Sequence, residues 1–343
     1  MKSNFAIFRH PDSSECAYVE CDDGDVTLSP SVAAVGRTDG FVFAPFDATD
    51  TTPVVILKGK SARFTSLHAG EQARPQPCRI MREEADRQQY GRDFDAFHRL
   101  VDQGTVSKIV LARTEDVETD TAADAFAMFD AACRQNPHCF VALVRTTVAG
   151  TWLTATPEIL LERSGGEYRT MALAGTMPHG GDTAACVWSE KNRTEQRLVA
   201  DYIRGIIKGC AHGLTEDGPY TFHAGGLVHL RTDFRFLADG ATSPGDLISR
   251  LHPTPAVCGF PMPLCRQFIA DHESGRREYY SGFCGPVTAA DMHLYVTLRC
   301  MKVNGTTLTL YAGGGILPDS RVEEEWNETV GKMQAMKACI TQP

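Results

Sequence analysis

The chain has 343 residues, of which 43% are hydrophobic and 22% are charged, and its formal net charge is −9. This composition supplies enough apolar material for a large core, and the negative charge excludes the basic field expected of a nucleic-acid-binding protein. No uncharged apolar run is long enough to span a bilayer, and the first residues lack the pattern of a signal peptide. The twelve cysteines form no C-x-x-C pair, so we expect free thiols in a reducing cytoplasm.

Secondary structure is predicted from hydrophobic spacing and turn signals. Residues 1–80 alternate short apolar runs with Gly, Asp and Pro, which predicts strands and loops. Helices are predicted over residues 83–104, 122–134, 189–209 and 322–340. Further strands are predicted over residues 106–113, 140–145, 152–156, 159–163, 168–173, 293–303 and 306–312. Because short turns join strands that are adjacent in the sequence, we expect largely antiparallel sheets with helices packed outside, an α+β architecture.

Two charged residues lie within apolar surroundings. Lys108 occurs inside the strand SKIVLAR. It either protects an exposed sheet edge or is desolvated by its neighbours, which disfavours its charged form and suits it to act as a general base. Glu158 follows Pro157 between two apolar runs. It either caps a turn, or burial raises its pKa and suits it to act as a general acid.

Acidic residues on two predicted helices suggest a metal site. Glu195 lies on the inward face of its helix, where an unpaired carboxylate is costly, so either Lys191 one turn earlier or a metal ion is its partner. The last helix places Glu325, Glu328 and Lys332 on one face. Glu328 and Lys332 could form no more than an exposed ion pair. Carboxylates from two separate helices, however, also suit Mg²⁺.

Two further features predict an anion-binding site. The motif LYAGGGILP places Gly313, Gly314 and Gly315 after a strand, and we expect a loop that presents backbone N–H groups to an anion. The motif is neither a Walker loop nor a G-x-G-x-x-G fingerprint, so it implies no nucleotide. In the strand over 293–303, alternation places Arg299 opposite the buried apolar residues, where it could clamp a carboxylate. Together, these residues predict an anionic substrate bound by magnesium, an arginine, a lysine and a glycine loop.

Seven motifs occur in an order that resembles the chorismate-utilising enzymes. They are SKIVLAR, TPEILL, ALAGT, SEKNRTEQ, LHPTPAVCGFP, YVTLRC and AGGGILPDSRVEEEWNET. That family includes isochorismate, salicylate, anthranilate and aminodeoxychorismate synthases. The similarity covers residues 83–337, whereas residues 1–80 match less clearly. The resemblance implies that residues 1–343 form one domain, with two large, mostly antiparallel β-sheets stacked between outer helices.

The same resemblance implies a role for each matching position. Lys108 matches the lysine that activates water for attack on C2 of chorismate, and Glu158 matches the acid that protonates the departing C4 hydroxyl. Glu195 and Glu328 match the magnesium ligands, with Glu325 acting nearby through water. The positions that match the substrate pocket are Gly175, Thr176, His229, Ala256, Arg299, Gly313, Gly314, Gly315 and Lys332.

Several positions favour the isochorismate branch of this family. Ala174 occupies the place of the lysine nucleophile in the PIKGT motif of aminodeoxychorismate synthases, which argues against a covalent amine route. Ammonia-using members tend to have glutamine where this chain has Lys108, and salicylate synthases usually lack the HPTPA motif. Asn192 is a departure, because many relatives have an acidic residue there, near the metal.

The resemblance therefore implies a cytoplasmic, magnesium-dependent isochorismate synthase, an isomerase. We expect a monomer whose substrate is chorismate, with no glutaminase subunit, nucleic acid or membrane as partner. The alternatives are a salicylate synthase that also eliminates pyruvate, an anthranilate-type enzyme, and a non-catalytic chorismate-binding protein. Menaquinone, a catechol siderophore and salicylate remain open as destinations of the product.

Overall fold

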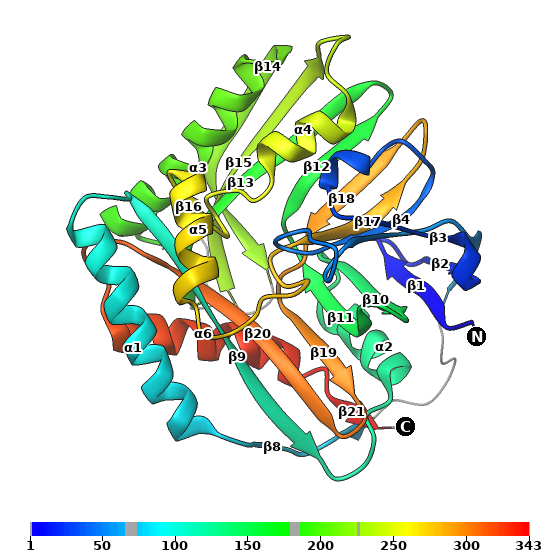
Figure 1. The fold of residues 1–343 in the computed structure, drawn as a ribbon, viewed down its shortest axis with the longest axis horizontal. Helices are drawn as coiled ribbons and strands as arrows, with labels where there is room; N and C mark the ends of the chain where they lie inside the picture. Colours follow the sequence, from blue (N-terminus) through cyan, green and yellow to red (C-terminus); the bar gives the residue numbers. More distant parts are fainter. Residues whose placement is uncertain (1, 66–73, 179–185, 225–226, 343) are drawn as a thin grey trace.

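The computed structural model describes residues 2–65, 74–178, 186–224 and 227–342 (Figure 1). Within these residues the helices are α1 (Glu83–Asp102), α2 (Ala125–Gln135), α3 (Glu190–Lys208), α4 (Pro244–Leu251), α5 (Met262–His272) and α6 (Val322–Lys337), with short 3-10 helices at Asp23–Asp25 and Val32–Ala34. No helix among the described residues combines the length and the apolar character that a membrane crossing requires.

Two large antiparallel sheets dominate the described part of the chain. The first sheet has the order β16 (Gly259–Phe260), β9 (Lys108–Thr119), β20 (Thr307–Ile316), β19 (Cys300–Asn304), β11 (Gly150–Thr156), β10 (Phe140–Thr146), β1 (Asn4–Arg9), β2 (Cys16–Cys21) and β6 (Lys60–Phe64), and β8 (Cys78–Ile80) also pairs with β9. The second sheet has the order β14 (Ala211–Ala224), β15 (Leu227–Ala238), β13 (Glu167–Pro178), β12 (Ile159–Ser164), β18 (Met292–Val296), β17 (Phe283–Val287), β4 (Gly40–Ala44), β5 (Val54–Leu57) and β3 (Val26–Ser29). β21 (Thr341–Gln342) and β7 (Arg74–Pro75) form a separate pair.

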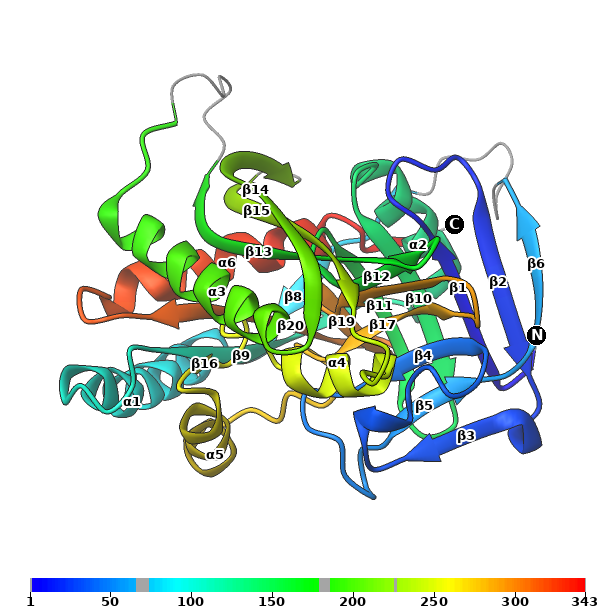
Figure 2. The ribbon, with the colours of Figure 1, turned by 90° about the horizontal axis from the view of Figure 1, so that it is seen from above.

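The apolar clusters explain why the sheets stack with helices outside. Phe140 and Trp152 of the first sheet share one buried cluster with Phe43 and Tyr295 of the second, so the inner faces of the two sheets pack together. A second cluster joins the outer face of the second sheet to α3 and α4, and two more join the outer face of the first sheet to α1, α2, α5 and α6. Figure 2 shows β1, β2 and β6 at the end of the molecule opposite α1. The predicted α+β architecture is confirmed.

Helix α3 follows its sequence signals closely. The side chain of Ser189 accepts a hydrogen bond from the backbone N–H of Asn192 at 3.2 Å, which caps the first turn. The helix ends at Gly209, as predicted. By contrast, α4, α5, β14 and β15 were not predicted. For α4 a signal was present, since Ser243 and Asp246 form a capping box and Pro244 between them is the first residue of the helix.

The prediction of one strand over residues 293–303 is wrong. β18 ends at Val296 in the second sheet, and β19 begins at Cys300 in the first sheet. Between them Arg299 has a φ of 46°, in the left-handed region. The alternating pattern continues through this break, so it could not reveal that the chain passes from one sheet to the other. Arg299 is therefore buried at the crossing rather than placed on the polar face of a strand.

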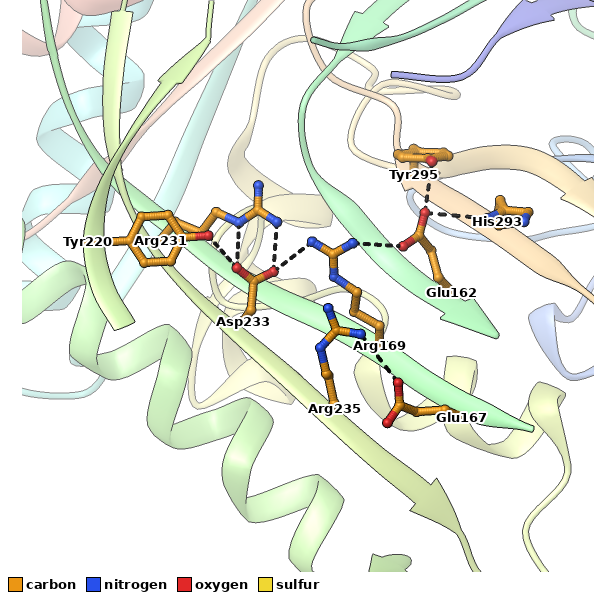
Figure 3. A network of polar contacts seen from close by, with 9 residues as sticks. All are labelled: Glu162, Glu167, Arg169, Tyr220, Arg231, Asp233, Arg235, His293 and Tyr295. Atoms are coloured by element: carbon orange, nitrogen blue, oxygen red, sulfur yellow. Dashed lines mark hydrogen bonds and ion pairs between the residues drawn. The ribbon is translucent and has the colours of Figure 1, made fainter. Parts of the chain in front are cut away.

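A ladder of charged and polar side chains crosses the second sheet (Figure 3). Asp233 accepts bidentate hydrogen bonds from Arg231 at 2.9 and 2.7 Å, and Arg169 bridges Asp233 and Glu162 at 3.1 and 3.5 Å. Because residues two apart on a strand share a face, His229 lies on the same face of β15 as this ladder. The ladder thus ties together the strands on which several predicted pocket residues lie.

Candidate active site

Lys108 is the first residue of β9, and its side chain is completely buried. β9 lies between β16 and β20 at this point, so the edge-strand alternative for Lys108 is wrong. Its Nζ lies 2.8 Å from Glu195 Oε1 on α3. In the described part of the chain this nitrogen has no well-aligned hydrogen-bond partner, which leaves its hydrogen-bonding capacity for a molecule beside it.

The partner proposed for Glu195 from helix spacing is also wrong. Lys191 does not pair with Glu195; it donates to Glu325 on α6. The side chain of Glu195 is 15% exposed. Burial opposes ionisation of this carboxyl, but the nearby positive charge of Lys108 holds its pKa below the usual value. Residue spacing along α3 could not show that Lys191 forms an ion pair with a residue of another helix, α6.

The three glycines do not form the predicted loop. Gly313, Gly314 and Gly315 lie within β20 and pair with Ala112, Leu111 and Val110 of β9. What they supply is space. A Cβ at Gly315 would lie 2.5 Å from Glu195 Oε1 and 2.6 Å from Lys108 Cε, far inside contact distance. Gly314 and Gly315, which have no side chains, therefore let helix carboxylates approach the strand that pairs with β9.

The first turns of α6 bring carboxylates to the same strand. A Cβ at Gly314 would lie 2.8 Å from Glu325 Oε2 and 3.8 Å from Glu328 Oε1. Lys332 donates to Glu328 Oε1 at 2.7 Å and to the carbonyl oxygen of Gly313 at 2.8 Å. The Glu328–Lys332 pair exists, but both side chains are mostly buried and Lys332 also binds the strand. It is therefore more than an exposed helical pair.

Glu158 lies between β11 of the first sheet and β12 of the second, and it is 5% exposed. Burial raises the pKa of its carboxyl to about 8, although the positive charges of Lys108, Lys332 and Arg299 act in the opposite direction. Its backbone carbonyl accepts from Val296 N at 2.9 Å, which ties the segment to β18. The carboxyl is therefore protonated near neutral pH and able to donate a proton.

Arg299 and His229 form a buried pair beside this carboxyl. Arg299 Nη2 lies 2.9 Å from His229 Nε2, and His229 Nδ1 lies 3.1 Å from Thr176 Oγ1. Burial, followed by the charge of Arg299, lowers the pKa of His229 well below its usual value. The imidazole is therefore neutral, and its Nε2 accepts the hydrogen bond from Arg299. Gly175, at a bulge with φ of 73°, lets β13 pass close to Asn192.

One cavity brings most of the predicted site residues together. It encloses about 740 Å³ including its open mouth, a size typical of a small-molecule site. The predicted residues that line it are Glu158, Gly175, Thr176, Glu195, His229, Ala256, Arg299, Gly313, Gly315, Glu328 and Lys332. Lys108, Gly314 and Glu325 do not line it, although Lys108 Nζ lies 2.8 Å from Glu195, which does. The prediction missed Val110, Leu173, Val257, Tyr280, Leu298 and Tyr311, apolar or aromatic residues that carry no polar signal in the sequence.

The carboxylates of α3 and α6 are suited to a divalent cation, although they do not form a complete cage. Within the residues that the structure describes, no group of three or more His, Cys, Asp or Glu side chains is arranged to hold a metal. Glu195 and Glu328 both line the cavity, where oxygen atoms of a ligand and of water could complete an octahedral shell. Carboxylate oxygens that line one cavity are compatible with Mg²⁺.

Comparisons with known proteins agree with this geometry. A family model described as "Chorismate binding enzyme" matches residues 44–341. Isochorismate synthase MenF of Escherichia coli K12 is 32% identical over 251 residues, which cover 71% of the chain and 58% of MenF. Isochorismate synthase EntC of the same strain is 32% identical over 240 residues, which cover 67% of the chain and 61% of EntC. The chain thus spans less than two thirds of the length of both relatives.

Solved structures show the same fold. The menaquinone-specific isochorismate synthase MenF of E. coli superposes with a TM-score of 0.82 over 98% of this chain and 89% of MenF, at 23% identity. Anthranilate synthase component I of Streptococcus pneumoniae has a TM-score of 0.73 over 97% of this chain and 90% of its own, at 16% identity. At these identities the structures establish the fold alone. Since the family model covers most of the residues, the chain belongs to the family of chorismate-binding enzymes.

Proposed function

We propose that this protein is a magnesium-dependent isochorismate synthase, which converts chorismate to isochorismate. The observation that carries the proposal is the placement of two buried groups at one cavity: Glu158 lines it, and Lys108 lies against Glu195 and Gly315, which line it. Lys108 approaches from β9, and Glu158, whose pKa burial raises to about 8, approaches from the junction of β11 and β12. A base and an acid on different segments of the chain can act at two different carbons of the substrate ring. This arrangement suits a displacement in which water adds at one carbon and a hydroxyl group leaves as water from another.

In the proposed reaction, Lys108 in its neutral form removes a proton from a water molecule as that water forms a bond to C2 of chorismate. The ring double bonds shift, the C4–O bond breaks, and Glu158 transfers its proton to the departing oxygen, which leaves as water. One water enters and one leaves, so the overall change is an isomerisation. The proton gained by Lys108 balances the proton lost by Glu158.

Positive side chains around the cavity would hold the carboxylates of chorismate. Arg299 contacts His229 at 2.9 Å and lines the cavity, where its guanidinium would meet a substrate carboxylate. Lys332 of α6 is fixed by Glu328 of the same helix and by the carbonyl oxygen of Gly313 in β20. We propose that Glu195 and Glu328 ligate Mg²⁺, with Glu325 acting through water. When bound, the cation would neutralise and orient one substrate carboxylate.

The remaining parts of the proposal concern the state of the protein. Strands from residues 1–80 belong to both large sheets, which supports a single domain over residues 1–343. All twelve cysteines are free, as a reducing cytoplasm would require. We also propose a monomer that needs no glutaminase subunit, because water rather than ammonia is the nucleophile.

Chromatography of purified protein incubated with chorismate tests the function. We expect an isochorismate peak that depends on added Mg²⁺, disappears with EDTA and returns when Mg²⁺ is restored in excess. Salicylate together with pyruvate would instead identify a salicylate synthase. A product that forms only with ammonia would identify an anthranilate-type enzyme. Tight binding of chorismate without turnover under any of these conditions would identify a non-catalytic binding protein.

The clearance at Gly315 predicts a severe defect for Gly315→Ala. The added Cβ would collide with Glu195 Oε1 and with Cε of the completely buried Lys108, so we expect kcat/KM to fall by at least roughly 10²-fold. Gly205→Ala on α3 is the matched control, because nothing lies within 4 Å of the added Cβ. It should retain activity and gain up to about 1 kcal/mol in free energy of unfolding. Equal activity in the two variants would contradict the proposed site.

A further inference from the structure

A buried ion pair outside the cavity occupies a gap in the first sheet. On the edge of β9 that faces away from β20, β16 pairs with Lys108 and Ile109, and β8 pairs with residues 117–119. The intervening segment has no strand partner among the described residues. Two side chains take the place of a strand there: Ala112 N donates to Glu273 Oε1 at 2.7 Å, and Arg277 Nη2 donates to the carbonyl oxygen of Val110 at 2.8 Å.

The two side chains are held rigidly by each other. Arg277 donates from Nε to Glu273 Oε2 and from Nη2 to Oε1, both at 2.6 Å. The side chains are 4% and 2% exposed, respectively. The guanidinium also lies 4.4 Å from the ring centre of Phe46. A planar, bidentate pair of this kind has little freedom, so it defines the position of whatever it binds.

The same guanidinium connects two walls of the cavity. Arg277 Nη1 donates to the carbonyl oxygen of Val257 at 2.7 Å, while Nη2 binds that of Val110. Val110 and Val257 both line the cavity. Val110 N also donates to the carbonyl oxygen of Cys258 at 2.9 Å. Arg277 therefore fixes the separation between β9 and the segment that contains Ala256 and Val257.

The position of Val110 controls the surroundings of Lys108. Val110 pairs with Gly315 on its other edge, and Lys108 lies two residues earlier on the same face of β9. Because Lys108 Cε lies so close to the Gly315 position, there is no space for β9 to shift relative to β20. A contribution to stability alone does not explain the Glu273–Arg277 ion pair well, because buried ion pairs can often be replaced by apolar residues without loss of stability.

We propose that Glu273 and Arg277 are positioning residues. They fix β9 so that Lys108 lies in the productive geometry for deprotonating the water molecule that attacks the substrate. Neither residue lines the cavity that contains Glu158 and Arg299. Their effect is transmitted through the backbone of Val110, Ala112 and Val257. The role in catalysis rests on the proposed isochorismate synthase activity, whereas the effect on the position of Lys108 does not.

Arg277→Lys tests the proposal, because it keeps the charge and removes the planar fork. We expect kcat to fall at least about tenfold while KM changes by less than about threefold, since orientation rather than affinity is lost. Arg204→Lys is the matched control. Arg204 makes a bidentate pair with Glu216 at 2.7 and 2.8 Å between α3 and β14, away from β9. It should retain wild-type kcat.

Crystal structures of the wild type and Arg277→Lys provide a second readout that does not depend on turnover. We expect the 2.8 Å separation of Lys108 Nζ and Glu195 Oε1 to change by roughly 0.5 Å or more. An unchanged separation, or a folded variant with kcat within twofold of wild type, would overturn the proposal.

If Arg277→Lys does not fold, the neutral double variant Glu273→Gln/Arg277→Gln replaces it. Failure of both to fold would assign the pair to stability and also overturn the proposal. A wild type without activity would reject the proposed function, and the structures would still decide the effect on Lys108.

Discussion

Replacing Lys108 by alanine is expected to reduce kcat by roughly 10²–10⁴-fold, the range that positioned acid–base groups contribute. Lys108 is fully buried, and in the proposed reaction it is the group that accepts the proton of the attacking water. The KM for chorismate should change much less, because Arg299 and Lys332 would hold the carboxylates. Steady-state assays with purified variant, whose folding is checked by circular dichroism, measure both constants.

The control for this variant is Lys302→Ala. Lys302 is also a strand lysine paired with a glutamate, Glu278, at 2.6 Å. Glu278 does not line the cavity, whereas Glu195, the partner of Lys108, does. Lys302→Ala should retain full turnover. Small alkylamines offer a further test, because they can enter the space left by the lysine and restore part of the activity of Lys108→Ala. Turnover near the wild-type value in Lys108→Ala would remove this residue from the mechanism.

Replacing Glu158 by glutamine is expected to reduce kcat by roughly 10²-fold or more. Glutamine has almost the same shape and can still form hydrogen bonds, but it has no acidic proton to give to the leaving oxygen. The packing between β11 and β12 should therefore survive while the chemical step is lost. Rapid-quench measurement of a single turnover separates this loss from any change in product release.

The pH dependence follows from the same group. Since burial raises the pKa of Glu158 to about 8, the active protonated form predominates at neutral pH and is lost as the pH rises through 8. The kcat/KM of the wild type should then fall by about tenfold per pH unit above that value, because kcat/KM reports the pKa values of the free enzyme. In Glu158→Gln this alkaline limb should be absent. A limb that persists unchanged in the variant would show that another group causes it.

Glu162→Gln is the matched control for the acid. Glu162 lies four residues further along the chain and accepts from Tyr295 at 2.8 Å within the polar ladder of the second sheet (Figure 3). It does not line the cavity. Its replacement should lower stability through the ladder but leave the kcat of the folded protein unchanged. A comparable loss of kcat in both variants would mean that Glu158→Gln acts through the sheet rather than through proton transfer.

Local sequence patterns determined much of the secondary structure. Helix α3 begins after Ser189 and ends at Gly209 because its cap and its terminating glycine act through neighbouring backbone groups. Short turns between adjacent strands were enough to predict antiparallel sheets, and the order of motifs was enough to identify the family. Most residues that the motifs selected do line one cavity. Such features depend on residues close together in the chain.

The tertiary structure decided the partners and surroundings of the charged groups. Lys108 could have been an edge residue or a buried one, and only the placement of β16 and β20 on either side of β9 made it buried. Arg299 was selected through an incorrect strand, since its burial results from the crossing between two sheets. Lys191 pairs with Glu325 because α6 lies beside α3. Contacts between residues far apart in the chain determine burial and charge pairing, and spacing within one segment contains no information about them.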